Sequence, residues 1–270
     1  MAIITISRGS FSGGTVVAEC LAERLGYRLV SREILASAAG RYGIAEEKLA
    51  QALERAPGLW ERLGHERRLY LVFIQAALCD MLADDGVVYH GHAGHLLLRG
   101  ISHVLRVRLI APLEYRLGAA MERLRLGREA AAEHVRRVDD ERARWTRFLY
   151  GIDWNSPALY DLVVNLEALS VETACAVVAH AASQAEFAPT PASRQALRDL
   201  TLACRVRAAL AADRTTARLE IEVAADGGEV TLSGTLRGED LAQTATAIAA
   251  AVPGVTAVRP QRLGSWKYAP

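Results

Sequence analysis

A glycine-rich turn near the N-terminus of this 270-residue chain has the residue types that most clearly suggest chemistry. The turn reads SRGSFSGGT over residues 7–15, after the apolar run IITI and before a segment with helical periodicity. Backbone N–H groups at a helix start lack partners within the helix, and glycines let the backbone curl closely around an anion. The sequence therefore predicts a phosphate-binding loop, formed by Arg8, Gly9, Ser10, Ser12, Gly13, Gly14 and Thr15.

The loop lacks the lysine that a Walker A motif places near the outer phosphates of a nucleotide. If the motif runs from Gly9 to Gly14, Thr15 stands at the lysine position. Alignment on Ser12 and Gly13 instead puts Gly14 at the lysine position and Thr15 at the hydroxyl position. We prefer this second alignment, because it leaves the Thr15 or Ser12 hydroxyl free to approach Mg²⁺. Arg8 is the nearest cation, and it is either the replacement for the lysine or a solvated turn residue.

A second set of cations lies in a charged segment, 128–148, that is expected to form one long helix. Helical spacing brings together a cluster of charged residues: Arg136, Arg137, Asp139, Asp140, Arg142 and Arg144. The planar guanidinium fork suits phosphate, but composition alone favours a solvated, salt-bridged helix. Several aromatic residues near its end fit a small apolar cluster that fastens the helix to a sheet: Trp145, Phe148, Tyr150 and Trp154.

The elements around these residues alternate between strands and helices up to about residue 183. Apolar runs at GVVYHG, HVLRVRLIA and YDLVVN predict buried strands, with helices at 66–83, after Pro112 and from Ser170. Strands separated by helices imply a parallel sheet with both faces covered, so the fold class is α/β.

The pattern changes after EFAPTPASR, residues 186–194, which we interpret as a linker. Beyond it we expect a helix at 194–212, a β-hairpin turning at Asp226-Gly227-Gly228, a helix at 238–251 and a last strand. The sequence thus predicts two separable domains, 1–185 and a small α+β domain at 195–264, with a chain ending near Ser183 expected to fold and bind nucleotide.

Composition excludes several classes of protein. The formal net charge of +1 argues against a general nucleic-acid binder, and no apolar run is long enough for a membrane span. The N-terminus reads as a strand and not as a signal peptide, and the four scattered cysteines fit buried free thiols. These features predict a cytoplasmic protein.

The stretch ITISRGSFSGGTVVAECLAERLGYRLVSREIL resembles the opening of the cytidylate-kinase-like family of P-loop nucleoside monophosphate kinases. The resemblance continues through VVYHGHAGHLLLRG, VLRVRLIAPLEYRL and VRRVDDERARWTRFLYGIDWNSPALYDLVVN and covers about residues 2–183. It implies a P-loop kinase fold and phosphoryl transfer from ATP, with Mg²⁺ bridging the donor phosphates and held in part by Thr15. The resemblance further implies a lid whose catalytic arginines are Arg137, Arg142 and Arg144.

The resemblance also places the phosphate acceptor, a nucleoside monophosphate similar to CMP, near Arg32, Glu33 and His92. This chain departs from the family pattern there, since Ser31 replaces an aspartate and His92 replaces an arginine. His90, His92 and His95 also suggest a metal site, because imidazole is a common metal ligand, but their spacing matches no compact zinc motif. The alternatives are a pH-sensitive phosphate contact and structural histidines.

Residues 205–263 resemble a BON domain, which implies binding to a lipid or a protein partner. We interpret this domain as a docking, regulatory or oligomerisation module. If it mediates oligomerisation, the protein would form a homo-oligomer. The leading hypothesis for the whole chain is an ATP-dependent nucleoside monophosphate kinase. The alternatives are a nucleotide-binding sensor without turnover, favoured by the three departures from the pattern, and an adaptor that binds no nucleotide.

Overall fold

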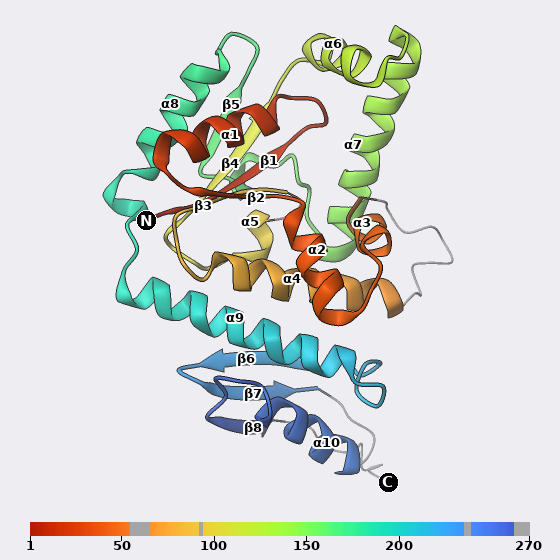
Figure 1. The fold of residues 1–270 in the computed structure, drawn as a ribbon, viewed down its shortest axis with the longest axis vertical. Helices are drawn as coiled ribbons and strands as arrows, with labels where there is room; N and C mark the ends of the chain where they lie inside the picture. The colour runs from red at the N-terminus through yellow and green to blue at the C-terminus, as the bar shows by residue number, and fades with distance from the viewer. Residues whose placement is uncertain (55–64, 92–93, 235–238, 262–270) are drawn as a thin grey trace. The chain divides into compact units, whose positions relative to one another are not determined.

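The computed structural model describes residues 1–54, 65–91, 94–234 and 239–261. Contacts divide the chain into two units, the first formed mainly by Met1–Glu33 and Asp84–Thr190. This unit is built on a parallel sheet of five strands in the order β2-β3-β1-β4-β5 (Figure 1). The strands are β1 (Ile3–Arg8), β2 (Arg28–Val30), β3 (Val87–His90), β4 (Val104–Ile110) and β5 (Leu162–Asn165).

Alternation along β1 gives the two faces of the sheet different characters. Ile4 and Ile6 lie in the apolar core with α1 (Gly14–Leu25) and α8 (Val171–Ala182), which pack side by side (Figure 1). Thr5 and Ser7 are buried too, but belong to the other set of alternating positions, so that polar groups lie beneath the opposite face.

Two helices next to the sheet form a hairpin, α6 (Leu113–Leu124) and α7 (Arg128–Tyr150), and α7 contains the arginine-rich run that the sequence predicted as a lid. A small apolar cluster joins them, and Phe11 of the glycine-rich loop packs against it. Two shorter elements belong to the connections between strands, α5 (Gly94–Leu97) after β3 and the 3₁₀ turn η2 (Pro157–Leu159) before β5. The Phe11 side chain therefore attaches the glycine-rich loop to the hairpin of α6 and α7.

The second unit contains Ile34–Ala52, the described part of 60–83 and the chain after Pro191. Its helices are α2 (Glu33–Tyr42), α3 (Glu46–Glu54), α4 (His65–Leu82), α9 (Pro191–Ala212) and α10 (Glu239–Ala250), and the turn η3 (Ala185–Phe187) precedes α9 in the chain. Its strands are β6 (Glu222–Asp226), β7 (Glu229–Ser233) and β8 (Ala257–Gln261). The predicted hairpin is confirmed, because Asp226 pairs with Glu229 and both intervening glycines have positive φ.

The predicted domain boundary put α4 in the first domain, whereas the contacts of this helix place it in the second unit with α9 (Figure 1). Phe73 and Cys79 of α4 are buried against Cys204 and Ala208 of α9, with the two sulfur atoms 3.6 Å apart. Asp80 forms ion pairs with Arg205 of α9 and with Arg41. Moreover, α9 begins inside the segment interpreted as a linker.

A shortened chain ending at Ser183 should therefore aggregate or melt well below the full chain, contrary to the expectation from the linker composition. Removal of α9 exposes the side chains of Phe73, Ala76 and Cys79, each at most 4% exposed in the full chain. Size-exclusion chromatography and thermal unfolding of the two chains measure the effect. A shortened chain ending at Ala212 retains α9 and is the matched control. A soluble 1–183 chain with unchanged melting temperature would support the original domain boundary.

The predicted α/β class is confirmed, as are the predicted strands at β3, β4 and β5 and the helices at α7, α8 and α10. Ser170 caps α8 by accepting a hydrogen bond from the backbone N–H of Thr173. The short strand β2 was not predicted. In the described part of the chain, no helix combines the length and apolar character needed to cross a membrane.

Candidate phosphate-binding site

The glycine-rich loop joins β1 to α1 at the carboxyl end of a central strand. Gly13 has φ +75° at the N-cap of α1, and Phe11 also has positive φ. The Ser12 hydroxyl donates a hydrogen bond of 2.8 Å to the carbonyl of Gly9, which closes the loop on itself. The first turn of α1 follows directly on this closed loop, and the N–H groups at a helix start are the ones that can bind an anion.

Arg8 lies where a lysine at position 14 would begin. A Cβ added to Gly14 would lie 2.9 Å from Cγ and Cδ of Arg8 and 3.0 Å from Nε2 of His90. Real Cβ atoms essentially never approach other heavy atoms below 3.0 Å, and neither Arg8 atom is at the flexible end of the side chain. The loop therefore has no room for a side chain at Gly14 while Arg8 keeps this conformation. The position of the Arg8 side chain thus depends on a glycine at position 14.

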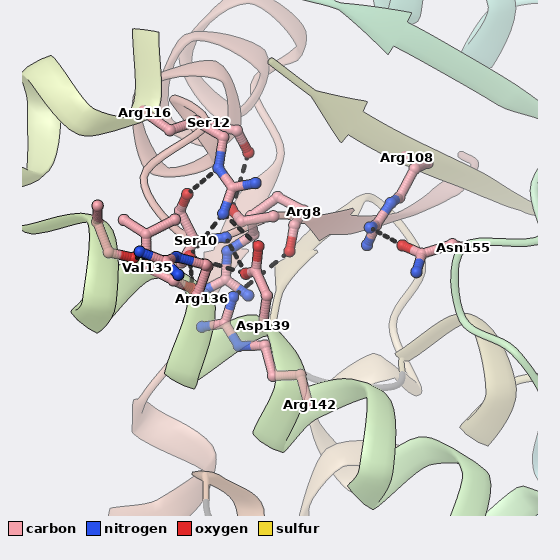
Figure 2. Close-up of polar contacts among 12 residues, drawn as sticks. Arg8, Ser10, Ser12, Arg108, Arg116, Val135, Arg136, Asp139, Arg142 and Asn155 are labelled. Atoms are coloured by element: carbon pink, nitrogen blue, oxygen red, sulfur yellow. Dashed lines mark hydrogen bonds and ion pairs between the residues drawn. The ribbon is translucent and has the colours of Figure 1, made fainter. Parts of the chain in front are cut away.

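Asp139 of α7 reaches the loop from the hairpin (Figure 2). Its Oδ1 accepts hydrogen bonds from the backbone N–H of Ser10 at 3.1 Å and from the Ser10 hydroxyl at 2.8 Å. Arg116 of α6 donates through Nε to the Ser10 carbonyl at 2.7 Å and forms an ion pair with Asp139. The Asp139 carboxylate thus accepts the hydrogen bond of one loop N–H group, that of Ser10, in this structure. Arg116 was not among the residues predicted for the site, because no sequence motif marks it.

Arg142 is the lid arginine that lies against the loop. Its Nη1 donates to the carbonyl of Arg8 at 3.5 Å, and its guanidinium is directed toward Arg8 and Asp139 (Figure 2). Arg8, Arg116 and Arg142 come from three different elements and converge around the loop. Their positive charges lie around a loop that has no lysine of its own.

The other lid arginines lie on exposed parts of α7. Arg137 contacts His134 and Glu141 of its own helix, and Arg144 donates to the carbonyl of Asp140. Arg136 likewise bonds its own helix, at the carbonyl of Ala132. The structure therefore brings Arg142 to the loop and leaves Arg137 and Arg144 directed to their own turns of helix.

The residues predicted for the acceptor lie elsewhere along the same edge of the sheet. Arg32 and Glu33 follow β2, which is separated from β1 by β3. The Glu33 carboxylate accepts hydrogen bonds from the backbone and hydroxyl of Ser31, a local cap at the start of α2. These hydrogen bonds and that of its own backbone lower the pKa of Glu33. His92 lies outside the described residues.

A cavity of about 260 Å³ opens beside the loop. Gly9, Arg116 and Asp139 form its wall at the loop, and Arg108 and Trp154 form another part of the wall. Within the described ranges, no group of three or more His, Cys, Asp or Glu side chains is arranged to hold a metal ion. The Thr15 hydroxyl, exposed in the first turn of α1, and the carboxylates of Asp139 and Asp140 are hard oxygen donors of the kind that suits Mg²⁺ brought in with a nucleotide.

Two buried histidines near this site are held in the neutral form. Burial, reinforced by Arg8 and Arg142, lowers the pKa of His90 to about 3. Burial, with Arg108 and Arg106, lowers the pKa of His95 to about 4. Neither Nε2 atom has a hydrogen-bond partner among the described residues. At neutral pH, His90 therefore adds no positive charge to the site.

The free energy of unfolding should fall as the pH drops below about 6.5, the pKa of an unperturbed imidazole. The unfolded chain binds these protons first, so the stability is fully present above that pH and is lost toward the folded-state pKa values of about 3 and 4. Each histidine should contribute about 1.4 kcal/mol per pH unit in this window. Urea unfolding between about pH 5 and 6.5 measures the slope. His90→Gln should reduce it, and an unchanged slope would exclude His90 as a cause.

The parallel sheet of order β2-β3-β1-β4-β5, with a glycine-rich loop between β1 and α1, is that of the P-loop kinases. The model of the cytidylate kinase-like family matches residues 3–168, and the chain belongs to this family. A BON domain matches residues 198–261, beginning within α9.

Three known proteins show how similar this chain is to others. A cytidylate kinase from Ignicoccus hospitalis is 29% identical over 175 residues, which cover 64% of this chain and 94% of that protein. An uncharacterized protein from Eubacterium ventriosum has a similar crystal structure, with a TM-score of 0.51 at 18% identity, covering 68% of this chain and all of that one. Shikimate kinase from Acinetobacter baumannii, solved with shikimate, has a TM-score of 0.39 at 15% identity over 66% of this chain and 90% of its own.

Proposed function

We propose that this protein transfers the terminal phosphoryl group of ATP to a nucleoside monophosphate, with CMP as the first candidate acceptor. The observation that carries this proposal is the convergence of Arg8, Arg116 and Arg142 on the loop after β1. Phosphoryl transfer needs positioning and charge neutralisation more than a covalent nucleophile, so such a cluster is the main requirement. Membership of the cytidylate kinase-like family supports the same reaction class.

In this proposal the loop residues from Ser12 to Thr15 hold the donor phosphates through backbone N–H groups. Arg8 binds the outer phosphates from the strand end, and Arg142 neutralises charge that develops during transfer. Mg²⁺ bound with ATP would supply further positive charge, with Thr15 as its protein ligand. Arg137 and Arg144 remain proposed members of the lid, and Arg32, Glu33 and His92 remain the proposed acceptor residues.

A second candidate function is a nucleotide-binding sensor without turnover. The contact of Asp139 with the Ser10 N–H group favours it, because a fixed carboxylate at a phosphate loop opposes the approach of a nucleotide. In both cases we infer that the BON domain is a docking or regulatory module, for a lipid, a protein or a second copy of the chain.

The deciding experiment pairs calorimetric titration of Mg·ATP with an ADP-release assay on a panel of nucleoside monophosphates and other acceptors. Gly13→Val is the loop control. Gly13 has φ +75°, which a β-branched residue rarely adopts, and a Cβ added there would lie 3.0 Å from Cδ1 of Leu166. ADP release with one acceptor, lost in Gly13→Val, is the expected result. ATP binding without ADP release would select the sensor, and no ATP binding would contradict both functions.

A further inference from the structure

Arg108 is a buried cation on the polar face of the sheet. Its side chain follows Val107 of the apolar core by one position on β4, so it lies on the face opposite α1 and α8. Arg108 is only 6% exposed. Burial lowers the pKa of the guanidinium from its usual value, but arginine stays protonated in proteins. A full positive charge is therefore buried beneath this part of the cavity.

Neutral groups hold this guanidinium in place. Its Nη1 donates to the Ser7 hydroxyl at 3.0 Å. Its Nη2 donates to Oδ1 of Asn155, also at 3.0 Å (Figure 2). The Trp154 ring lies beneath it, with the guanidinium carbon 4.0 Å from the ring centroid. Ser7 in turn contacts the Tyr160 hydroxyl, which donates to the carbonyl of Trp154. The network fixes the orientation of the charge without neutralising it.

Nearby carboxylates are engaged elsewhere. Among the described residues no ion pair joins Arg108 to an acid, since Asp139 pairs with Arg116 and the residue Asp140 is solvent-exposed. Asp139 affects Arg108 only through longer-range attraction. A buried charge without a counter-charge costs folding free energy, and the cost is explained when a ligand supplies the opposite charge.

We propose that Arg108 and Asn155 form an oxyanion subsite for the phosphoryl acceptor, in the cavity they share with Gly9 and Arg116. The cavity, about 260 Å³, lies near the lower limit of about 300 Å³ for ligand pockets, so it suits an anionic group and a small part of its parent molecule. The donor phosphates belong over the N-terminus of α1, whereas Arg108 lies on the opposite face. In-line transfer requires the acceptor beyond the terminal phosphate, and we assign the acceptor to this side because the cavity extends from Gly9 at the loop to Arg108.

The subsite recognises an oxyanion, either the phosphate of a nucleoside monophosphate or the carboxylate of a small hydroxy acid. The inference rests on the proposed function only in assigning this oxyanion to the acceptor. Calorimetry on the full chain would use inorganic phosphate, CMP, cytidine, D-glycerate and Mg·ATP as probes. Tighter binding of CMP would identify the oxyanion as a phosphate, and tighter binding of D-glycerate would identify it as a carboxylate. The affinity for cytidine shows what the base and sugar contribute without the phosphate.

Arg108→Met should weaken the binding of phosphate, and of the tighter acceptor probe, about 10- to 100-fold and leave the affinity for Mg·ATP unchanged. Arg106→Met is the matched control, because it removes the same charge from the same strand where Arg106 is paired with Asp161. The melting temperature of Arg108→Met should fall no further than that of Arg106→Met, as expected for a binding group and not for a structural one.

Unchanged phosphate and acceptor affinities in Arg108→Met would overturn the subsite, as would a wild-type protein that binds none of the oxyanion probes. An equal loss of Mg·ATP affinity would assign the oxyanion to the donor and overturn the acceptor assignment. If wild type binds phosphate through Arg108 but never binds ATP, the subsite stands and the proposed function fails. If Arg108→Met does not fold, Arg108→Lys takes its place: loss of the planar fork should weaken phosphate about 10-fold, and unchanged affinity would overturn the proposal.

Discussion

Replacement of Arg142 with alanine should lower the turnover number on the order of 10²-fold while changing the affinity for Mg·ATP little. Arg142 lies against the loop, where its Nη1 reaches the carbonyl of Arg8. A charge-assisted contact made mainly in the transition state affects turnover more than ground-state binding. Steady-state ADP release with the best acceptor and calorimetric titration of Mg·ATP measure the two quantities separately.

Arg144→Ala is the matched comparison for this prediction. It removes the same charge from the same helix, two positions along, where the guanidinium is exposed and bonds its own helix. We expect a smaller loss of turnover than in Arg142→Ala. Equal losses would show that α7 turns both arginines toward the phosphates when the substrates bind. Wild-type turnover in both variants would remove the lid from the mechanism.

Introduction of the missing lysine should damage the site instead of improving it. In Gly14→Lys the new Cβ would overlap Cγ and Cδ of Arg8 and approach Nε2 of His90. Arg8 would have to leave its place, or the loop would open, and we expect at least a 10-fold weaker affinity for Mg·ATP. Arg8→Ala should also bind more weakly, because it removes the cation at the strand end.

The double variant Arg8→Ala/Gly14→Lys should recover much of the lost affinity, since the lysine then has both space and a role. A double-variant cycle measured by calorimetry gives the coupling between the two positions, and we expect it to be strongly favourable. Additive losses would mean that Arg8 does not replace the lysine. Restored affinity without restored turnover would place Arg8 in transfer as well as in binding.

These two tests also separate the kinase from the sensor. A sensor that binds ATP without transfer would show the affinity changes at Arg8 and Gly14, but it has no turnover for Arg142→Ala to lower. The Asp139 carboxylate at the Ser10 N–H group is the structural reason for keeping this alternative. In either function Arg116 is expected to be released from Asp139 when a nucleotide approaches.

Much of the fold could be predicted because its signals are local in sequence. The alternation along β1, the helical periodicity of α1 and the hairpin at Asp226–Glu229 each arise within a few residues. The loop could be predicted for the same reason, since a helix N-terminus after glycines is a contiguous feature. The three-residue strand β2 escaped prediction, because so short a run carries no periodicity.

The contacts that define the candidate site join residues far apart in sequence. Asp139 meets Ser10 across 129 positions, and the Arg108 guanidinium meets Asn155 across 47. No spacing rule distinguishes Arg116 from other helical arginines. Its contact with Ser10 follows only from the position of α6 in the fold. Composition at Pro189 and Pro191 indicated a linker, but the burial of α4 on α9 depends on the complementary apolar faces of two distant helices.

The sequence by itself determined which segments become strands and helices, where an anion can bind at a helix start, and that the loop lacks a lysine. Only the tertiary structure decided which cations lie beside the loop, which lid arginine reaches it, and which buried arginine forms no ion pair with an acid among the described residues. The physical reason is that backbone periodicity and turn chemistry act over a few residues. Charge compensation and steric exclusion depend instead on distances in space, which only the packed sheet and helices determine.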